Sequence, residues 1–155
     1  MFGALLLASV SQSVIASQTE VGWIEQVEIG SMGLTIEAKI DTGADNSSIN
    51  AKNPTLYQKD GRQWVRFSVQ SENEHEIVID KPVIKKTKIK TKNGGSQERV
   101  VIELDICLGA IKKRARVNLV DRSHFKYQVL VGRSFLSPDF LVDSNKIFSL
   151  KPQCQ

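Results

Sequence analysis

The chain has 155 residues, of which 41% are hydrophobic, and it carries a formal net charge of +4. This length is sufficient for one domain with a substantial core, and it excludes a chain built from two full-sized lobes. The basic residues are not interleaved with aromatic residues and form no known binding module, so nucleic acid is not an expected partner.

The first residues of the chain predict a signal peptide over residues 1–16. Phe2–Val10 is hydrophobic, and small residues at Val14–Ala16 suit a cleavage site. No Lys or Arg precedes the hydrophobic stretch, so an incorrect start or a buried terminus is the alternative. We expect an exported protein, periplasmic or secreted, with a cytoplasmic location as the alternative. The stretch is too short to span a bilayer, so no stable membrane insertion is expected.

Strand patterns dominate the chain after residue 16. Residues alternate between apolar and polar over Val65–Val69 and Ala115–Leu119, as in half-buried strands. Asn53–Gly61 is expected to be a surface connection, and Arg133–Leu136 a short helical turn. The sequence therefore predicts an all-β, barrel-like domain. The expected strands cover residues 23–29, 34–40, 63–69, 76–79, 83–92, 99–108, 113–120, 129–131 and 147–150.

A carboxylate follows the apolar strand expected at 34–40. Asp41 is succeeded by Thr42, Gly43 and Ala44. A carboxylate can activate water only where water can reach it, and Gly43 has no Cβ to block that approach. The same residue types are common in turns, so this motif alone is weak evidence. A second segment, Val129–Leu136, strengthens the interpretation of Asp41 as catalytic, because an apolar strand there is followed by a Gly-Arg pair.

These two segments, in this order, resemble the retropepsin-like aspartic peptidases, in which an Asp-Thr-Gly-Ala loop packs against a late apolar-apolar-Gly-Arg segment. Asn93-Gly94-Gly95 is similar to the tip of that family's flap hairpin, and the run from 99 to 120 to the hairpin after it. The chain also resembles a bacterial group labelled ATP-dependent zinc proteases, associated by name with a ribosomal-protein glutamate ligase. The residues that carry this likeness are Ile36–Ala51, Arg99–Glu103, Val120–Arg122, Leu130–Leu136 and Leu141–Asp143.

The residues contradict part of that group's label. Histidine occurs only at His75 and His124, and neither has a partner at helical spacing, as a His-Glu-x-x-His zinc motif requires. The sequence also lacks a glycine-rich loop that ends in Gly-Lys-Ser or Gly-Lys-Thr and could cradle a nucleotide phosphate. We therefore expect no cofactor, neither ATP nor catalytic zinc, and no metal site.

The resemblance implies a retropepsin-like peptidase domain over residues 17–155 with Asp41 as the catalytic residue. No other aspartate in the chain is followed by Thr-Gly or Ser-Gly. A pair of carboxylates then requires two copies of the chain, so a single-lobe, two-fold homodimer is expected. The implied function is an aspartic endopeptidase. The alternative is a non-catalytic periplasmic peptide-binding domain with the same fold.

The family pattern also assigns roles to the neighbours of Asp41. Thr42 would brace the two loops across the dimer axis, and Gly43 and Ala44 would keep the cleft floor small. Asp45 would contact substrate and form a partly buried pair with Arg133, the residue that follows Gly132. Arg99 matches an arginine of the bacterial group, and recognition of a substrate carboxylate is the role that we expect for it.

Lysines are concentrated between residues 81 and 92. Lys88, Lys90 and Lys92 are expected to share one strand face. If this hairpin is the flap, these lysines would attract an acidic, glutamate-rich peptide. Protection of an edge strand against aggregation explains the same pattern equally well.

The two cysteines, Cys107 and Cys154, leave two alternatives. They could form a disulfide in an exported protein. The apolar run around Cys107 favours instead a buried small side chain.

Overall fold

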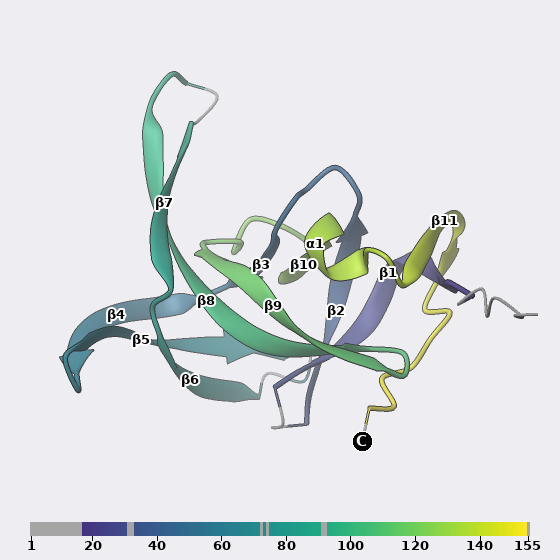
Figure 1. The fold of residues 1–155 in the computed structure, drawn as a ribbon, viewed down its shortest axis with the longest axis horizontal. Coiled ribbons are helices and arrows are strands. Elements are labelled where there is room, and N and C mark those ends of the chain that lie inside the picture. The colour runs from purple at the N-terminus through teal and green to yellow at the C-terminus, as the bar shows by residue number, and fades with distance from the viewer. Residues whose placement is uncertain (1–16, 31–32, 72, 74, 91–92, 155) are drawn as a thin grey trace, which may run out of the picture.

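The computed structural model describes residues 17–30, 33–71, 73, 75–90 and 93–154 (Figure 1). The expected signal peptide and Lys92 lie outside these residues. A search of the described residues finds no helix long and apolar enough to cross a membrane.

The described residues fold mostly into strands, with one short helix, which confirms the predicted all-β class. The strands are β1 (Thr19–Ile29), β2 (Leu34–Asp41), β3 (Ser47–Asn50), β4 (Lys52–Lys59), β5 (Arg62–Gln70), β6 (Glu76–Pro82), β7 (Lys85–Lys90), β8 (Ser96–Leu108), β9 (Ile111–Val120), β10 (Val129–Gly132) and β11 (Phe140–Ile147). The short helix α1 covers Arg133–Leu136, where a helical turn is expected from the sequence.

The main sheet has eight strands in the order β11-β1-β2-β10-β3-β9-β8-β7 (Figure 1). Strand β1 also pairs with β8, so the strands from β1 to β8 in this order close into a ring, and β11 and β7 lie outside it. Strand β2 shows how the sequence divides the sheet into two faces. Ile36, Ala38 and Ile40 are buried in the core, whereas Lys39 and Asp41 are partly exposed. Because neighbouring side chains on a strand point to opposite faces, Lys39 and Asp41 lie together on the polar face.

Residues 53–61 form most of a strand and its turn, so the prediction of a surface connection there was wrong. Strand β4 pairs with β5, which pairs with β6, in a second sheet of three strands. Most side chains of β4 are exposed, so the sequence has no apolar alternation to reveal the strand. Across this sheet, Asp80 accepts hydrogen bonds from Tyr57 and Arg66. These hydrogen bonds lower the pKa of Asp80, and the bond from Tyr57 has the largest effect.

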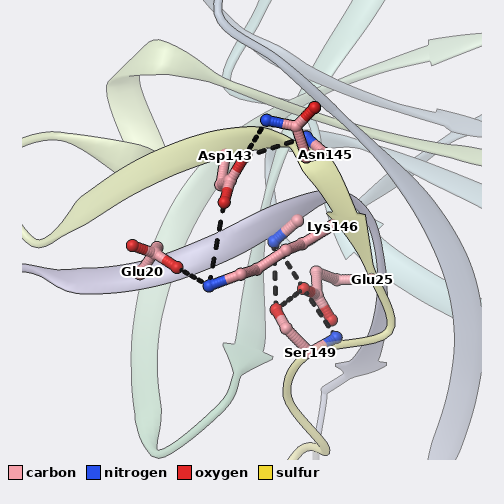
Figure 2. A network of polar contacts seen from close by, with 7 residues as sticks. Glu20, Glu25, Asp143, Asn145, Lys146 and Ser149 are labelled. Carbon is pink, nitrogen blue, oxygen red and sulfur yellow. Dashed lines mark hydrogen bonds and ion pairs between the residues drawn. The ribbon is translucent and has the colours of Figure 1, made fainter.

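The last strand begins earlier than the expected 147–150, which corrects that prediction. Strand β11 starts at Phe140 and runs parallel to β1. The segment after it is held by the N–H of Phe148, which donates to the Ile24 carbonyl of β1 at 2.8 Å, and by a side chain. The buried carboxylate of Glu25 on β1 accepts hydrogen bonds from the backbone N–H of Ser149 at 3.1 Å and from the Ser149 hydroxyl (Figure 2). It also accepts one from the N–H of Leu150 at 3.1 Å.

The C-terminal segment is also tied to the turn between β8 and β9. Cys107 and Cys154 form a disulfide, so the interpretation of Cys107 as an unpaired buried thiol was wrong, although it is 1% exposed. The N–H of Gln153 donates to the carbonyl of Gly109 at 2.8 Å. A bond between cysteines 47 residues apart depends on how the tail folds back, which local sequence patterns do not report.

Candidate active site

The two sequence motifs meet at the end of the β2–β10 pair. Strand β10 lies parallel to β2, and Gly132 is paired directly with Asp41. A Cβ at position 132 would lie 2.7 Å from the backbone carbon of Asn46 and 2.9 Å from the backbone oxygen of Asp45. Glycine is therefore required for the close approach of the two segments.

Backbone hydrogen bonds hold the loop that carries Asp41. The Gly43 N–H donates to Oδ1 of Asp41 at 2.9 Å, and the N–H of Ala44 donates to the Asp41 carbonyl at 3.2 Å. At the start of α1, the backbone N–H of Arg133 donates to the Ala44 carbonyl at 2.9 Å. The side chain of Arg133 donates through Nη1 to the Thr42 carbonyl at 2.8 Å. The carboxylate is thus oriented by a hydrogen-bonded loop, while Thr42 and Gly43 remain exposed.

The expected pair between Asp45 and Arg133 is present but not partly buried. Nη2 of Arg133 lies 3.8 Å from Oδ1 of Asp45, and the two side chains are 52% and 72% exposed. An exposed pair contributes about 0–1 kcal/mol to stability, so breaking this pair should cost little in the single chain. The loop is connected to α1 through three carbonyls, those of Thr42, Ala44 and Asp45, and sequence patterns do not reveal these bonds.

Lys39 contacts the candidate catalytic carboxylate, although the sequence motif gave it no role. Its Nζ lies 3.4 Å from Oδ2 of Asp41, and the two side chains are 44% and 25% exposed. The sequence could have predicted this contact, because residues two apart on a strand share a face.

Arg122 is a second cation near the site that sequence reasoning left without a role. It is 8% exposed, and its guanidinium donates to the Tyr127 carbonyl at 3.0 Å and to the Ser48 hydroxyl at 3.2 Å. Burial and the nearby charge of Arg99 lower the pKa of Arg122, while the charge of Asp41 acts in the opposite direction. Among the described residues Arg122 forms no ion pair.

Strands β7 and β8 form the expected flap-like hairpin, which extends as a long arm from the body of the fold (Figure 1). Its described lysines, Lys85, Lys86, Lys88 and Lys90, are exposed. Arg99 on β8 is half-buried and contacts the side chain of Gln97 at 3.4 Å. In Figure 1 the tip of the arm and the loop between β2 and β3 lie on the same, upper side of the molecule.

Two of the hollows in the surface lie beside the hairpin and beside the Asp41 loop. One of about 550 Å³ lies between the hairpin, the start of β4 and the end of β9, with Lys52, Glu98 and Leu119 in its wall. Another of about 290 Å³ adjoins the Asp41 loop and is lined mainly by apolar side chains, with Thr42 and Leu141 in its wall. Within the described part of the chain, no group of three or more His, Cys, Asp or Glu side chains is arranged to hold a metal ion.

An Asp-Thr-Gly-Ala loop packed against a Gly-Arg segment in an all-β fold defines a retropepsin-like protein. Comparison with protein families agrees. Residues 20–153 match the RimB-like family, described as retropepsin-like aspartic endopeptidase RimB, and the chain belongs to this family. The resemblance noted in the sequence is thereby confirmed.

Individual relatives carry a different name. A protein of Shewanella pealeana named probable alpha-L-glutamate ligase is 34% identical over 118 residues, which are 74% of this chain and 26% of that protein. A protein of the same name from Desulfotalea psychrophila is 30% identical over 142 residues, 86% of this chain and 28% of that protein. The chain thus spans about a quarter of the length of these relatives.

A solved structure shares the fold. The crystal structure of Lpg0085 from Legionella pneumophila, a protein of unknown function, is 31% identical to this chain with a TM-score of 0.75. The match covers 87% of this chain and 100% of that one.

Proposed function

We propose that this chain is an aspartic endopeptidase in which two copies of Asp41, one from each subunit of a two-fold homodimer, activate water. The observation that carries the proposal is the pairing of Asp41 with Gly132, because it places a loop-held carboxylate at an exposed edge of the fold. The family supports this chemistry by its description as an aspartic endopeptidase.

The proposed mechanism follows from two carboxylates at close range. Two such groups cannot both ionise easily, so the pair shares one proton. The ionised Asp41 takes a proton from water as the water oxygen attacks the peptide carbonyl carbon. The protonated Asp41 donates a hydrogen bond to the carbonyl oxygen, and a proton then passes to the leaving nitrogen as the C–N bond breaks.

The proposed dimer is expected to depend on the apolar hollow beside Thr42. Leu141 in that hollow is 55% exposed, so Leu141→Arg should leave the subunit folded but place a charge in the contact between subunits. We expect this variant to sediment as a monomer and to lose hydrolysis. Val78→Arg is the matched control, since Val78 is 61% exposed on β6 of the second sheet. A wild-type monomer with full peptidase activity would contradict the two-subunit site.

Acidic peptides are the substrate class that we propose. The exposed lysines of β7 supply positive charge on the hairpin, and buried Arg122 has no ionic partner among the residues described. An unpaired buried cation is costly, and a substrate carboxylate would compensate it. Edge protection remains the competing explanation for the β7 lysines alone.

The Lys88→Gln, Lys90→Gln double variant separates these two roles. If the lysines steer substrate, the apparent KM for glutamate-rich peptides should rise by roughly tenfold at low salt, with neutral peptides unaffected. Added salt should weaken the wild-type preference, because the Debye length falls from about 10 Å at 0.1 M to about 3 Å at 1 M. Lys151→Gln, in the exposed C-terminal segment, is the control. Equal kinetics on both peptide classes with increased aggregation would support edge protection.

The direct test of the proposed function is hydrolysis of glutamate-rich and mixed peptides by the purified protein over a range of pH. Tight binding without cleavage would favour the non-catalytic peptide-binding alternative.

Export to the periplasm or outside the cell is also proposed, because the Cys107–Cys154 disulfide suits an oxidising compartment.

A further inference from the structure

Arg122 is a buried cation whose side-chain partners are all neutral. Its Nε donates to the Tyr127 carbonyl and its Nη1 to the Ser48 hydroxyl, and the ring of Phe125 lies 4.8 Å from Cζ. These contacts fix the plane of the guanidinium. Among the described residues, Nη2 has no hydrogen-bond partner and the side chain has no ion pair. One side of a fixed, buried guanidinium is therefore left to donate to another group.

The register of the sheet places Arg122 over the face that carries Asp41. Lys39, Leu130 and Ser48 are paired one after another across β2, β10 and β3, so their side chains share a face. Asp41 lies on this face, two residues after Lys39. Because paired strands lie about 4.8 Å apart, the Ser48 hydroxyl lies roughly 10 Å from strand β2. An extended peptide covers that distance with about three residues.

Arg99 is a second arginine on the same face. Asn118 of β9 is paired with Ser48 on one side and with Val101 of β8 on the other. Arg99 lies two residues before Val101 and therefore shares its face. It is half-buried, it is close enough to Arg122 for the two charges to interact, and it forms no ion pair with any described residue. Two neighbouring guanidinium groups without a carboxylate form a site suited to an anion.

The carboxylates nearest to this arginine pair in the sheet and in the sequence have other contacts. Asp41 lies 3.4 Å from Lys39, and Glu98 forms an ion pair with a lysine of β7 at 3.3 Å. Asp121 accepts a hydrogen bond at 2.9 Å from a backbone N–H of its own loop. Glu37, on the same face of β2 as Lys39, lines a separate hollow of about 410 Å³. The charge of the two arginines is therefore not balanced by these groups.

We infer that Arg99 and Arg122 together bind one carboxylate of the peptide substrate, about three residues from the bond that is cleaved. This inference rests on the proposed function and deepens it. The exposed lysines of β7 would attract any acidic peptide, whereas the arginine pair would select a carboxylate at one position. The planar fork of a guanidinium matches the two oxygens of a carboxylate. That carboxylate belongs either to a glutamate side chain or to the C-terminus of the peptide.

The test compares neutral decapeptides that carry one glutamate, moved along the chain, with the same peptides carrying glutamine. At one position wild type should prefer glutamate by roughly 10–100-fold in kcat/KM, as expected for hydrogen bonds to a charged group. The preference should appear mainly in KM, because the site lies away from the reacting atoms. Amidation of the peptide C-terminus separates the two sources of the carboxylate, since it removes the preference only if the arginines bind the chain end.

Two variants assign the preference to the arginine pair. Arg99→Gln removes a half-buried charge, and Arg122→Lys keeps the charge but loses the fork. Each should reduce the preference to less than about threefold, with neutral peptides cleaved as by wild type. Arg62→Gln, exposed on β5 of the second sheet, is the matched control and should keep the full preference. An unchanged preference in Arg99→Gln would overturn the inference, as would a wild type that discriminates neither glutamate nor the free C-terminus.

A binding measurement separates this inference from the proposed function. Isothermal titration of the same peptides into Asp41→Asn, with and without Arg99→Gln, needs no hydrolysis. We expect one carboxylate position to tighten binding by roughly tenfold or more, and Arg99→Gln to remove this gain. This result in a protein whose wild type cleaves no peptide would overturn only the proposed peptidase. Cleavage by wild type without any such gain in binding would overturn only the arginine site.

Discussion

Replacing Asp41 with asparagine is expected to abolish peptide hydrolysis and to leave the fold intact. Asparagine keeps the volume of the side chain, and its amide oxygen can still accept the hydrogen bond from Gly43 N–H at the position of Oδ1. It cannot take a proton from water, so activity should fall by at least about 10²–10⁴-fold, the usual contribution of general acid–base catalysis. The measurement is the initial rate of peptide cleavage by wild type and variant at matched concentrations.

Asp60 provides a matched control for this substitution. Asp60 is also an aspartate close to a turn glycine, Gly61, and it lies between β4 and β5, outside the Asp41 loop. Its φ of 50° is one that asparagine adopts readily, so Asp60→Asn should fold normally and retain full activity. Thermal unfolding of Asp41→Asn should differ little from wild type, because the Asp41 side chain is partly exposed. Full activity in Asp41→Asn would reduce Asp41 to a turn residue.

Replacing Glu25 with glutamine is expected to give the largest loss of stability among these variants. The Glu25 side chain is fully buried, and its carboxylate accepts hydrogen bonds from both the N–H and the hydroxyl of Ser149 (Figure 2). It also accepts from Gly22 N–H at 2.6 Å and from Leu150 N–H at 3.1 Å. A glutamine NH₂ group would face one or more of these donors. The lost charge-assisted bond and the unpaired buried donor together should cost about 2–4 kcal/mol of unfolding free energy.

Urea unfolding at constant pH, with the disulfide intact, measures this loss. Glu20→Gln is the matched control, because Glu20 lies on the same strand but forms an exposed ion pair with Lys146, which should contribute less than about 1 kcal/mol (Figure 2). Amide hydrogen exchange should also become faster at Ser149 and Leu150 in Glu25→Gln, since Glu25 holds these N–H groups. A loss no larger than that of Glu20→Gln would show that the tail is held by other contacts.

Local patterns predicted the parts of the site that depend on neighbours in sequence. The glycine at the end of β10 and the loop after β2 were identified separately from their residues, and the structure joins them by pairing Gly132 with Asp41. Lys39 could have been found by the same reasoning, because its contact with Asp41 follows from strand alternation. Arg122 could not, because its burial depends on Ser48 and Tyr127, which come from separate segments.

The sequence by itself determined the all-β class, most strand positions and the Asp-Thr-Gly loop, because alternation and glycine turns are written in residues close together in the chain. Only the tertiary structure decided the positions of β4 and β11, the Cys107–Cys154 bond and the capture of the tail by Glu25. These features join segments far apart in sequence or lie on exposed strands. Their stability comes from backbone pairing and burial between distant segments, which no short window of sequence records.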